Sequence, residues 1–189
     1  EVVRGRSLAV FERVFMLLDD FRGLSTWLAS GSLLHYRSWT DRDLDAAADL
    51  ICQAYRNHID SQINDQYRSI TDARRFLVNS TQYPGCGVFM QKAGYVAVEP
   101  VANMLCGICL GNLVQPQVGH ITQLCVAPYA RGHGVGRALL RHSVQAFRDH
   151  GCDAVSLTVT NSNQEAVHFY ERLGFGVLRR FFAFVVEIP

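Results

Sequence analysis

One stretch, Gly119 to Gly136 (GHITQLCVAPYARGHGVG), limits most strongly what the chain can fold into. Its first part, Ile121 to Val126, is mostly apolar and contains β-branched residues, which predicts a strand. A turn with Pro128 follows, and alternating glycines then lead into a helical periodicity. A helix entered through glycines leaves its first main-chain N–H groups unpaired, beside the positive end of the helix dipole. The stretch therefore predicts a strand, a glycine loop and a helix N-terminus that can bind an anion.

The charges around this loop suit a polyanionic cofactor. Residues 131 to 148 contain four arginines and no acid, which gives a formal charge of +4. A P-loop would require GxxxxGK[ST], and no GK[ST] follows the glycines. A dinucleotide-binding fold would require GxGxxG, whereas Gly132, Gly134 and Gly136 alternate. A nucleotide-dependent oxidoreductase is therefore disfavoured.

Four landmarks in this order resemble the GNAT superfamily of N-acyltransferases. The family's acyl-CoA pyrophosphate loop, [QR]xxGx[GA], is matched by Arg131, Gly134 and Gly136. A strand at residues 154 to 160 follows, then Asn163 seven residues before Tyr170, and then a closing Leu-Gly-Phe. The resemblance is close over residues 119 to 178 and looser from about Leu33. The alternative is an ordinary α/β domain with a glycine-capped helix.

The resemblance implies a mixed α/β (α+β) fold. Its central sheet is expected to be mostly antiparallel, with six or seven strands flanked by helices and a splay between the fourth and fifth strands. The chain agrees with this, since residues 95–98, 105–114 and 120–126 read as three strands joined by short turns. Helices are expected from Thr40 or Asp41 to about Asn57, near Asp72–Val78, and from the glycine loop to Gly151.

The first 32 residues are expected to form a separate helical extension before the domain at 33–189. Leu8, Phe11, Phe15 and Leu18 follow a helical spacing within residues 7 to 22. We interpret this segment as a docking helix, whose apolar stripe could also pair two subunits in a homodimer. Residues 33–39 and 177–188 predict the first strand and the last one or two strands.

The resemblance also assigns roles to single residues. Acetyl-CoA is the implied co-substrate, and its binding falls to Leu124, Cys125, Val126, Arg131, Gly132, His133, Gly134, Val135, Gly136, Arg137 and Asn163. Tyr170 occupies the position of the general acid that protonates the departing thiolate, with a core tyrosine as the alternative. His120 occupies a position where many relatives carry the general base, and it is our first choice over a structural histidine. Glu99 and Asp65 are reserve bases.

The acceptor is expected to be a primary amine. Residues 41 to 72 contain seven aspartates and three arginines, a balance of −4 that slightly favours a cationic acceptor. Asp60, Asp65 and Tyr67 lie in the segment that borders the acceptor site in GNAT proteins, and a solvated loop is the equal alternative. The leading hypothesis is an N-acetyltransferase acting on a small amine or on a protein N-terminus or lysine. The alternative is a catalytically silent acyl-CoA-binding module with a regulatory role.

Composition sets wider limits. A chain of 189 residues that is 49% apolar and 19% charged suits one globular core. The net charge of +1 gives no pull toward nucleic acid or membrane, and no apolar run is long enough for a spanning helix. The six cysteines are scattered, and Cys106 and Cys109 fall on opposite faces of a predicted strand, so we expect neither disulfides nor a metal site. A cytoplasmic location is the default expectation.

Overall fold

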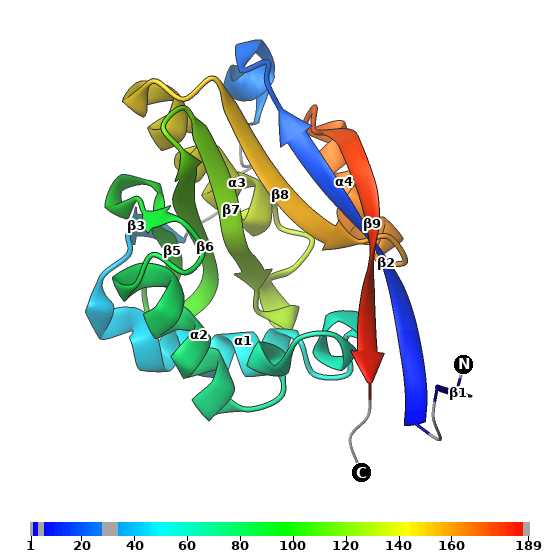
Figure 1. The fold of residues 1–189 in the computed structure, drawn as a ribbon. Helices are drawn as coiled ribbons and strands as arrows, with labels where there is room; N and C mark the ends of the chain where they lie inside the picture. Colours follow the sequence, from blue (N-terminus) through cyan, green and yellow to red (C-terminus); the bar gives the residue numbers. More distant parts are fainter. Residues whose placement is uncertain (1, 4–5, 28–33, 187–189) are drawn as a thin grey trace.

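The computed structural model describes residues 2–3, 6–27 and 34–186 of the chain. Within them, one mixed sheet runs in the order β1-β2-β8-β7-β6-β5-β3, with β9 paired to β2 and β4 to β6 (Figure 1). Its strands are β1 (Val2–Val3), β2 (Arg6–Leu18), β3 (His35–Ser38), β4 (Val88–Phe89), β5 (Tyr95–Glu99), β6 (Met104–Gln115), β7 (Val118–Val126), β8 (Ala154–Thr160) and β9 (Gly176–Val186). All neighbours pair antiparallel except β7 and β8.

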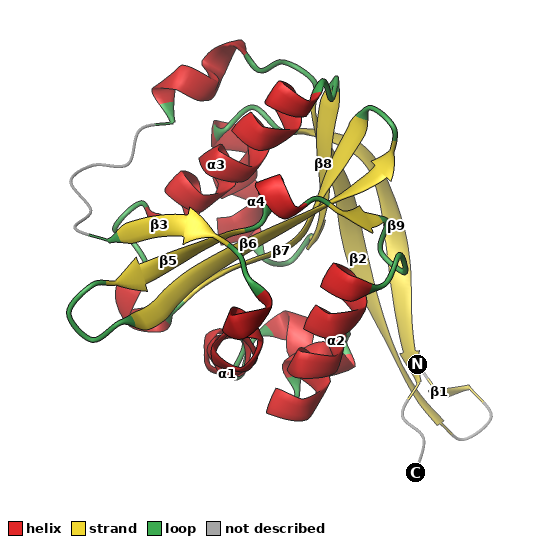
Figure 2. Cartoon of the chain, turned by 90° about the vertical axis from the view of Figure 1, so that its left-hand side faces the viewer, coloured by secondary structure: helices red, strands yellow, loops and turns green. Residues whose placement is uncertain are grey.

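Four α-helices cover the sheet. They are α1 (Leu44–Ala54), α2 (Ile70–Gln82), α3 (Val135–His150) and α4 (Gln164–Arg172). Figure 2 shows α3 and α4 on one side of the sheet and α1 and α2 on the other. In the described part of the chain, no helix combines the length and the apolar character that crossing a bilayer requires.

Glycines in β6 and β7 allow α3 to lie close to the sheet. A Cβ added at Gly111 or Gly119 would come within 2.6 Å of the Phe147 ring, and one at Gly107 within 2.8 Å of Leu139. Both α3 side chains are fully buried. Because only a residue without a side chain leaves room here, these positions fix the side of the sheet on which α3 packs.

The predicted splay is confirmed at β7 and β8. The two strands pair only from Val118↔Ala154 to His120↔Ser156. Beyond this point β7 and β8 diverge, as Figure 1 shows, and each keeps its other neighbour. The sheet therefore opens into a V whose arms are residues 121–126 and 157–160.

The predicted helix at residues 7 to 22 is wrong, because β2 occupies most of this segment. β2 lies inside the sheet, between β8 and β9. Its two faces both carry apolar side chains: Val14 and Met16 are fully buried, while Phe11 and Phe15 are half-buried. A strand covered on both faces lacks the polar alternation of a half-exposed strand, and its apolar residues can fit a helical spacing by chance.

The correction also removes the helical stripe on which the homodimer prediction was based. The dimer stays a prediction, and the edge strand β9 exposes Phe182 and Phe184. The domain boundary predicted between residues 32 and 33 lies outside the described residues, as do Leu33 and Ile188 at the predicted strand ends. The other predicted helices and strands are confirmed with ends shifted by a few residues, and residues 154–160 match β8 at both ends.

Candidate active site

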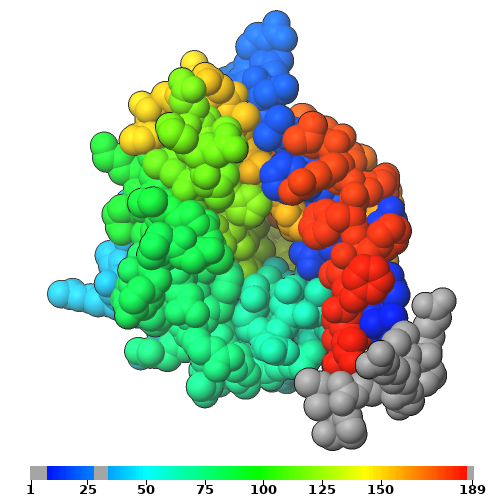
Figure 3. Space-filling model, viewed as in Figure 1, coloured from blue at the N-terminus to red at the C-terminus, as the bar shows by residue number. Residues whose placement is uncertain are grey.

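The V between β7 and β8 opens into a cleft of ≈ 490 Å³. The cleft is lined by the diverging arms of both strands, the glycine loop before α3, one face of α4 and the segment between α1 and α2. Figure 3 shows a hollow at this place, between the green strands and the blue and red pair formed by β2 and β9. The lining residues come from segments far apart in the sequence, so the cleft depends on the whole fold.

The glycine loop presents bare main-chain N–H groups. Gly132 and Gly134 adopt φ angles of +77° and +76°, the left-handed region that favours glycine. The first helical N–H with an acceptor is that of Ala138, which donates to Gly134 O over 3.0 Å. Among the described residues, no protein acceptor is recorded for the N–H groups of residues 132–137. The loop therefore has the donors and the helix dipole that an anion such as a diphosphate requires.

Side chains around the loop hold it in place and add charge. Arg131 donates to Ala54 O (2.8 Å) at the end of α1 and to Val126 O (3.3 Å), so it ties the loop to both neighbours. His133 Nδ1 lies 2.7 Å from Arg131 O, and its side chain is outside the cleft. Arg137 lines the cleft near the helix N-terminus. The other predicted cofactor residues also line the cleft: Leu124, Cys125, Val126, Gly132, Gly134, Val135, Gly136 and Asn163.

Asn163 has two partners of its own. It is the N-cap of α4, where Oδ1 accepts the Ala166 N–H at 3.2 Å. Its Nδ2 lies 3.2 Å from His58 Nε2, so it links α4 to the segment between α1 and α2. The asparagine therefore holds two walls of the cleft together.

Tyr170 lines the cleft from α4. Its ring makes edge contacts with Phe169 and Phe175, with centroids 5.1 and 5.7 Å away. Burial raises the pKa of the Tyr170 phenol well above 10, and Tyr67 and Asp60 nearby add to the shift. In the described part of the chain the phenol has no recorded hydrogen-bond partner. It therefore remains protonated and can donate to a group in the cleft.

His120 lies on β7 where the V begins to open, just outside the lining of the cleft. Its ring stacks on Phe15, with centroids 6.2 Å apart, and its Nδ1 is 2.9 Å from Ser156 Oγ. Because the Ser156 hydroxyl donates to Gly119 O over 3.1 Å, its oxygen is left to accept a hydrogen bond from Nδ1–H. In this arrangement Nδ1 carries the proton and Nε2 has a free lone pair. Burial lowers the pKa of His120 below 6.5, so this lone pair is available at neutral pH.

The wall of the cleft formed by the segment between α1 and α2 contains a tyrosine pair, of which only Tyr67 was predicted from the sequence. Tyr55 and Tyr67 stack with centroids 3.8 Å apart. Gln123 on β7 joins them, because Tyr67 Oη donates to its Oε1 (3.2 Å) and its Nε2 donates to Tyr55 Oη (3.1 Å). Burial raises the pKa of Tyr67 to about 12 and that of Tyr55 well above 10, so both remain neutral. No local motif marks Tyr55 or Gln123, since their pairing depends on packing of α1 against β7.

Of the predicted acceptor residues, Asp60 and Tyr67 line the cleft and Asp65 does not. Asp60 is 8% exposed and accepts a hydrogen bond from the Thr160 hydroxyl on β8. Asp65 is exposed and pairs with Arg68 at 2.9 Å. The reserve base Glu99 accepts the N–H groups of Val101 and Ala102 in a turn at the end of β5.

Cys125 is the cysteine that lines the cleft. Burial raises the pKa of its thiol to about 12, and the nearby Arg131 lowers it by a smaller amount. A thiol of this pKa carries almost no thiolate at neutral pH and is a weak nucleophile. No group of three or more His, Cys, Asp or Glu side chains within the described ranges is placed to hold a metal ion.

An open V in a mixed sheet, with a glycine-entered helix at one end, defines the GNAT class of fold. Comparison with known proteins agrees, because the family model described as "Acetyltransferase (GNAT) family" matches residues 44–175. The GCN5-related N-acetyltransferase from Sphaerobacter thermophilus superposes with a TM-score of 0.65 at 18% identity, over 94% of this chain and 51% of that one. The chain therefore belongs to the acetyltransferase (GNAT) family.

Two relatives in sequence carry acetyltransferase names. Streptothricin acetyltransferase from Streptomyces lavendulae is 46% identical over 55 residues, which cover 29% of this chain. An uncharacterized N-acetyltransferase from Methanocaldococcus jannaschii is 30% identical over 140 residues, or 74% of this chain. The matches span only 29% and 59% of the lengths of these two relatives.

Proposed function

We propose that the protein transfers the acetyl group of acetyl-CoA to a primary amine. The cleft through the V carries this proposal, because it joins the bare N–H groups of residues 132–137 to the phenol of Tyr170. We place the diphosphate of CoA on these N–H groups and run its pantetheine arm along Leu124, Cys125 and Val126. The thioester then lies near Tyr170, and the amine enters from the side of α1 and α2.

The reaction needs a proton donor for the departing thiolate. We assign this role to Tyr170, whose raised pKa keeps it protonated over the physiological range. A CoA thiolate is less basic than the phenolate of this tyrosine, so full proton transfer from the phenol is uphill. Tyr170 therefore acts by donating a hydrogen bond to the sulfur as negative charge develops on it while the carbon–sulfur bond breaks. The assignment predicts that Tyr170→Phe slows turnover without weakening acetyl-CoA binding.

The amine must lose a proton before or during attack. We assign the acceptance of this proton to Nε2 of His120, acting through water because His120 lies just outside the cleft lining. The hydrogen bonds of Ser156 leave Nε2 unprotonated, and the lowered pKa keeps the ring neutral. His58 lines the cleft, so a variant of His58 is the comparison that tests whether His120 is the base.

We propose direct attack of the amine within a ternary complex. The alternative is an acyl-enzyme on a nucleophilic side chain, for which Cys125 is the cysteine in the cleft. Its pKa of about 12 leaves it protonated at neutral pH, which disfavours nucleophilic attack on the thioester. Cys125→Ala is expected to retain turnover, and intact-protein mass spectrometry after mixing with acetyl-CoA is expected to find no added acetyl group.

The test is a panel of primary amines incubated with acetyl-CoA, with CoA thiol release and product mass as the two readouts. Release that depends on both the amine and the protein supports the proposal, and intersecting double-reciprocal plots support the ternary complex. Tyr170→Phe is the variant, and Tyr83→Phe is a matched control, because Tyr83 is 60% exposed and outside the cleft. If calorimetry detects acetyl-CoA binding but no tested amine releases thiol, the silent binding module is favoured over the enzyme.

A further inference from the structure

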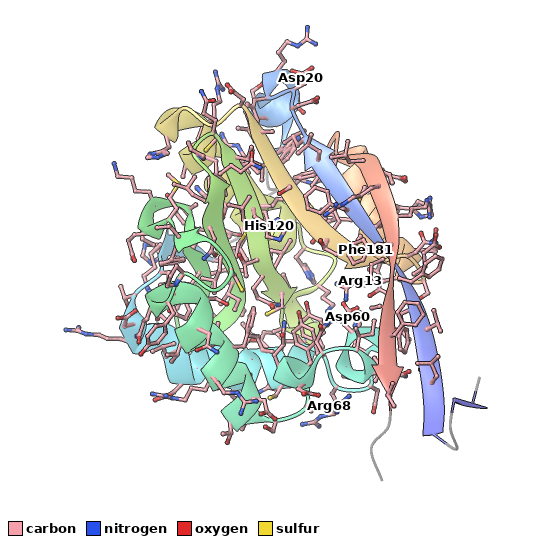
Figure 4. The ribbon with its side chains drawn as sticks, viewed as in Figure 1. Arg13, Asp20, Asp60, Arg68, His120 and Phe181 are labelled. Carbon is pink, nitrogen blue, oxygen red and sulfur yellow. The ribbon has the colours of Figure 1, made fainter. Side chains whose placement is uncertain are left out.

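Arg13 is a cation in the cleft that the proposed reaction does not use. It lies in the middle of β2, directly opposite Thr160 of β8 and Phe181 of β9. Side chains of directly opposed residues in a sheet point to the same face. Thr160 reaches Asp60 between α1 and α2, so Arg13 also points to the face that carries α1 and α2. Figure 4 shows Arg13 and Asp60 in the space between β7 and β9.

The helix α3, which follows the glycine loop, packs on the other face of the sheet through Phe147 against Gly111 and Gly119. The glycine loop and Arg13 line different parts of one cleft. Since the proposed function places the diphosphate on the loop, we assign Arg13 to the part of the cleft that receives the acceptor.

Arg13 has no partner within the described part of the chain. Its Nε is buried and makes no hydrogen bond, and no ion pair to its guanidinium is recorded. The neighbouring acid on β2, Glu12, binds Arg180 and Asn161 instead. The residue is only partly buried, but its buried Nε–H is left unsatisfied, which is costly, so an acceptor oxygen that a ligand brings fits this position.

The acids that suggested a cationic acceptor are not free charges beside Arg13. Four of them form ion pairs outside the cleft lining: Asp43 with Arg37, Asp45 with Arg74, Asp65 with Arg68, and Asp72 with Arg75. Asp60 does line the cleft, but it accepts the Thr160 hydroxyl and lies 3.8 Å from His58. A second cation, Arg179, stands 5.0 Å from the Phe15 ring on the same face as Arg13.

We infer that the acceptor amine also carries an anionic oxygen group, a carboxylate or a phosphate monoester, which the guanidinium of Arg13 binds. This inference rests on the proposed acetyl transfer and deepens it. A planar guanidinium donates two parallel hydrogen bonds to such a group, and Phe15 and Phe181 flank the arginine with apolar surface. Arg13 is thus a specificity residue for the acceptor and has no part in CoA binding.

Two variants and one control test the inference. Arg13→Met removes the charge and keeps the length of the stem, and Arg13→Lys keeps the charge without the paired donors. Arg180→Met is the control, because it removes the same charge from β9 outside the cleft. Urea unfolding of each variant checks that it is folded.

The first measurement does not need turnover. The Arg13 Nε–H signal, identified by its loss in Arg13→Met, is followed by proton–nitrogen NMR while acetate or inorganic phosphate is added to the CoA-bound protein. A saturable shift of this signal supports the inference and shows which anion binds better. No shift with either probe overturns it.

The second measurement compares acceptors that differ only in the anionic group: phenylalanine against 2-phenylethylamine, and O-phosphoethanolamine against ethanolamine. The wild type is expected to prefer the anionic member of a pair, and Arg13→Met to lower its kcat/KM by about 10- to 100-fold. The uncharged member and the KM for acetyl-CoA should change little, and Arg180→Met should behave like the wild type. Equal effects on both members overturn the inference. A failure of the wild type to bind acetyl-CoA in calorimetry overturns the proposed function instead.

Discussion

Gly134 provides the sharpest test of the anion site, because the chain offers a matched glycine at the other end of the same helix. Gly134 and Gly151 are the two caps of α3, with φ angles of +76° and +92°. An alanine in this conformation costs about 1–2 kcal/mol of folding free energy at either position. A Cβ at Gly151 would touch nothing within 4 Å, so strain is the whole expected effect there.

Gly134→Asp adds a charge to the strain. The introduced carboxylate lies at the positive end of the α3 dipole, where its charge repels a diphosphate and competes with it for the first N–H groups. Hydrogen bonds to a charged group contribute about 1.5–3 kcal/mol each, so losing two of them costs about 3–6 kcal/mol of binding. The Kd for acetyl-CoA is therefore expected to rise by a factor of about 10² to 10⁴.

The assay is calorimetric titration with acetyl-CoA, combined with urea unfolding of each variant. Gly134→Ala and Gly151→Ala should lose similar stability, while Gly151→Ala keeps the wild-type Kd. Gly134→Asp should remain folded, because the helix dipole favours a negative charge at the N-terminus and this offsets part of the strain. Wild-type affinity of folded Gly134→Asp for acetyl-CoA, or an equal loss of affinity in Gly151→Ala, would refute the anion site at this loop.

Three further predictions concern the proton donor, the base and the sheet. Tyr170→Phe should lower kcat by about 10²- to 10⁴-fold with an unchanged Kd for acetyl-CoA, and an undiminished kcat would remove the assignment. The pKa of His120 is lowered by burial, so its share of stability is present above pH 6.5 and is lost as pH falls below that value. His120→Gln should therefore flatten the dependence of unfolding free energy on pH below 6.5. It should also remove the fall of kcat/KM at low pH, and an unchanged fall would contradict the role of His120 as base. Gly119→Ala, which drives a Cβ to 2.6 Å from Phe147, should cost about 1–3 kcal/mol in urea unfolding, whereas Gly23→Ala meets no atom within 4 Å and should be nearly neutral.

Local patterns in the sequence were enough to predict the glycine loop and its flanking elements. Residues 154–160 form β8 as predicted, and α3 runs from Val135 to His150 with Gly151 as its C-cap. These features are encoded by residues that are neighbours in the chain: glycine at positive φ, a short β-rich run and a capped amphipathic helix. The splay of β7 from β8 was expected from the resemblance to the GNAT family, and the pairing of the two strands confirms it.

Long-range pairing explains what the sequence analysis missed. The position of β2 in the sheet depends on its pairing with β8 and β9, which come at the other end of the chain. The same pairing brings Arg13 into the cleft, although nothing in its neighbourhood marks it as a site residue. Tyr55 and Gln123 also meet only because α1 packs against β7. The excess of aspartates is a weaker guide to the acceptor than the charge count suggests, because the count ignores local ion pairs that neutralise several of them.

The central claim is that the N–H groups ahead of α3 hold the diphosphate of coenzyme A. Proton–nitrogen NMR tests it most directly, by following the main-chain amides of residues 132–137 during titration with coenzyme A and, separately, with pantetheine, which lacks the diphosphate. Saturable shifts of these amides with coenzyme A and none with pantetheine are the predicted result. Saturable coenzyme A binding that leaves these amides unmoved, or no binding to the folded protein, would contradict the account.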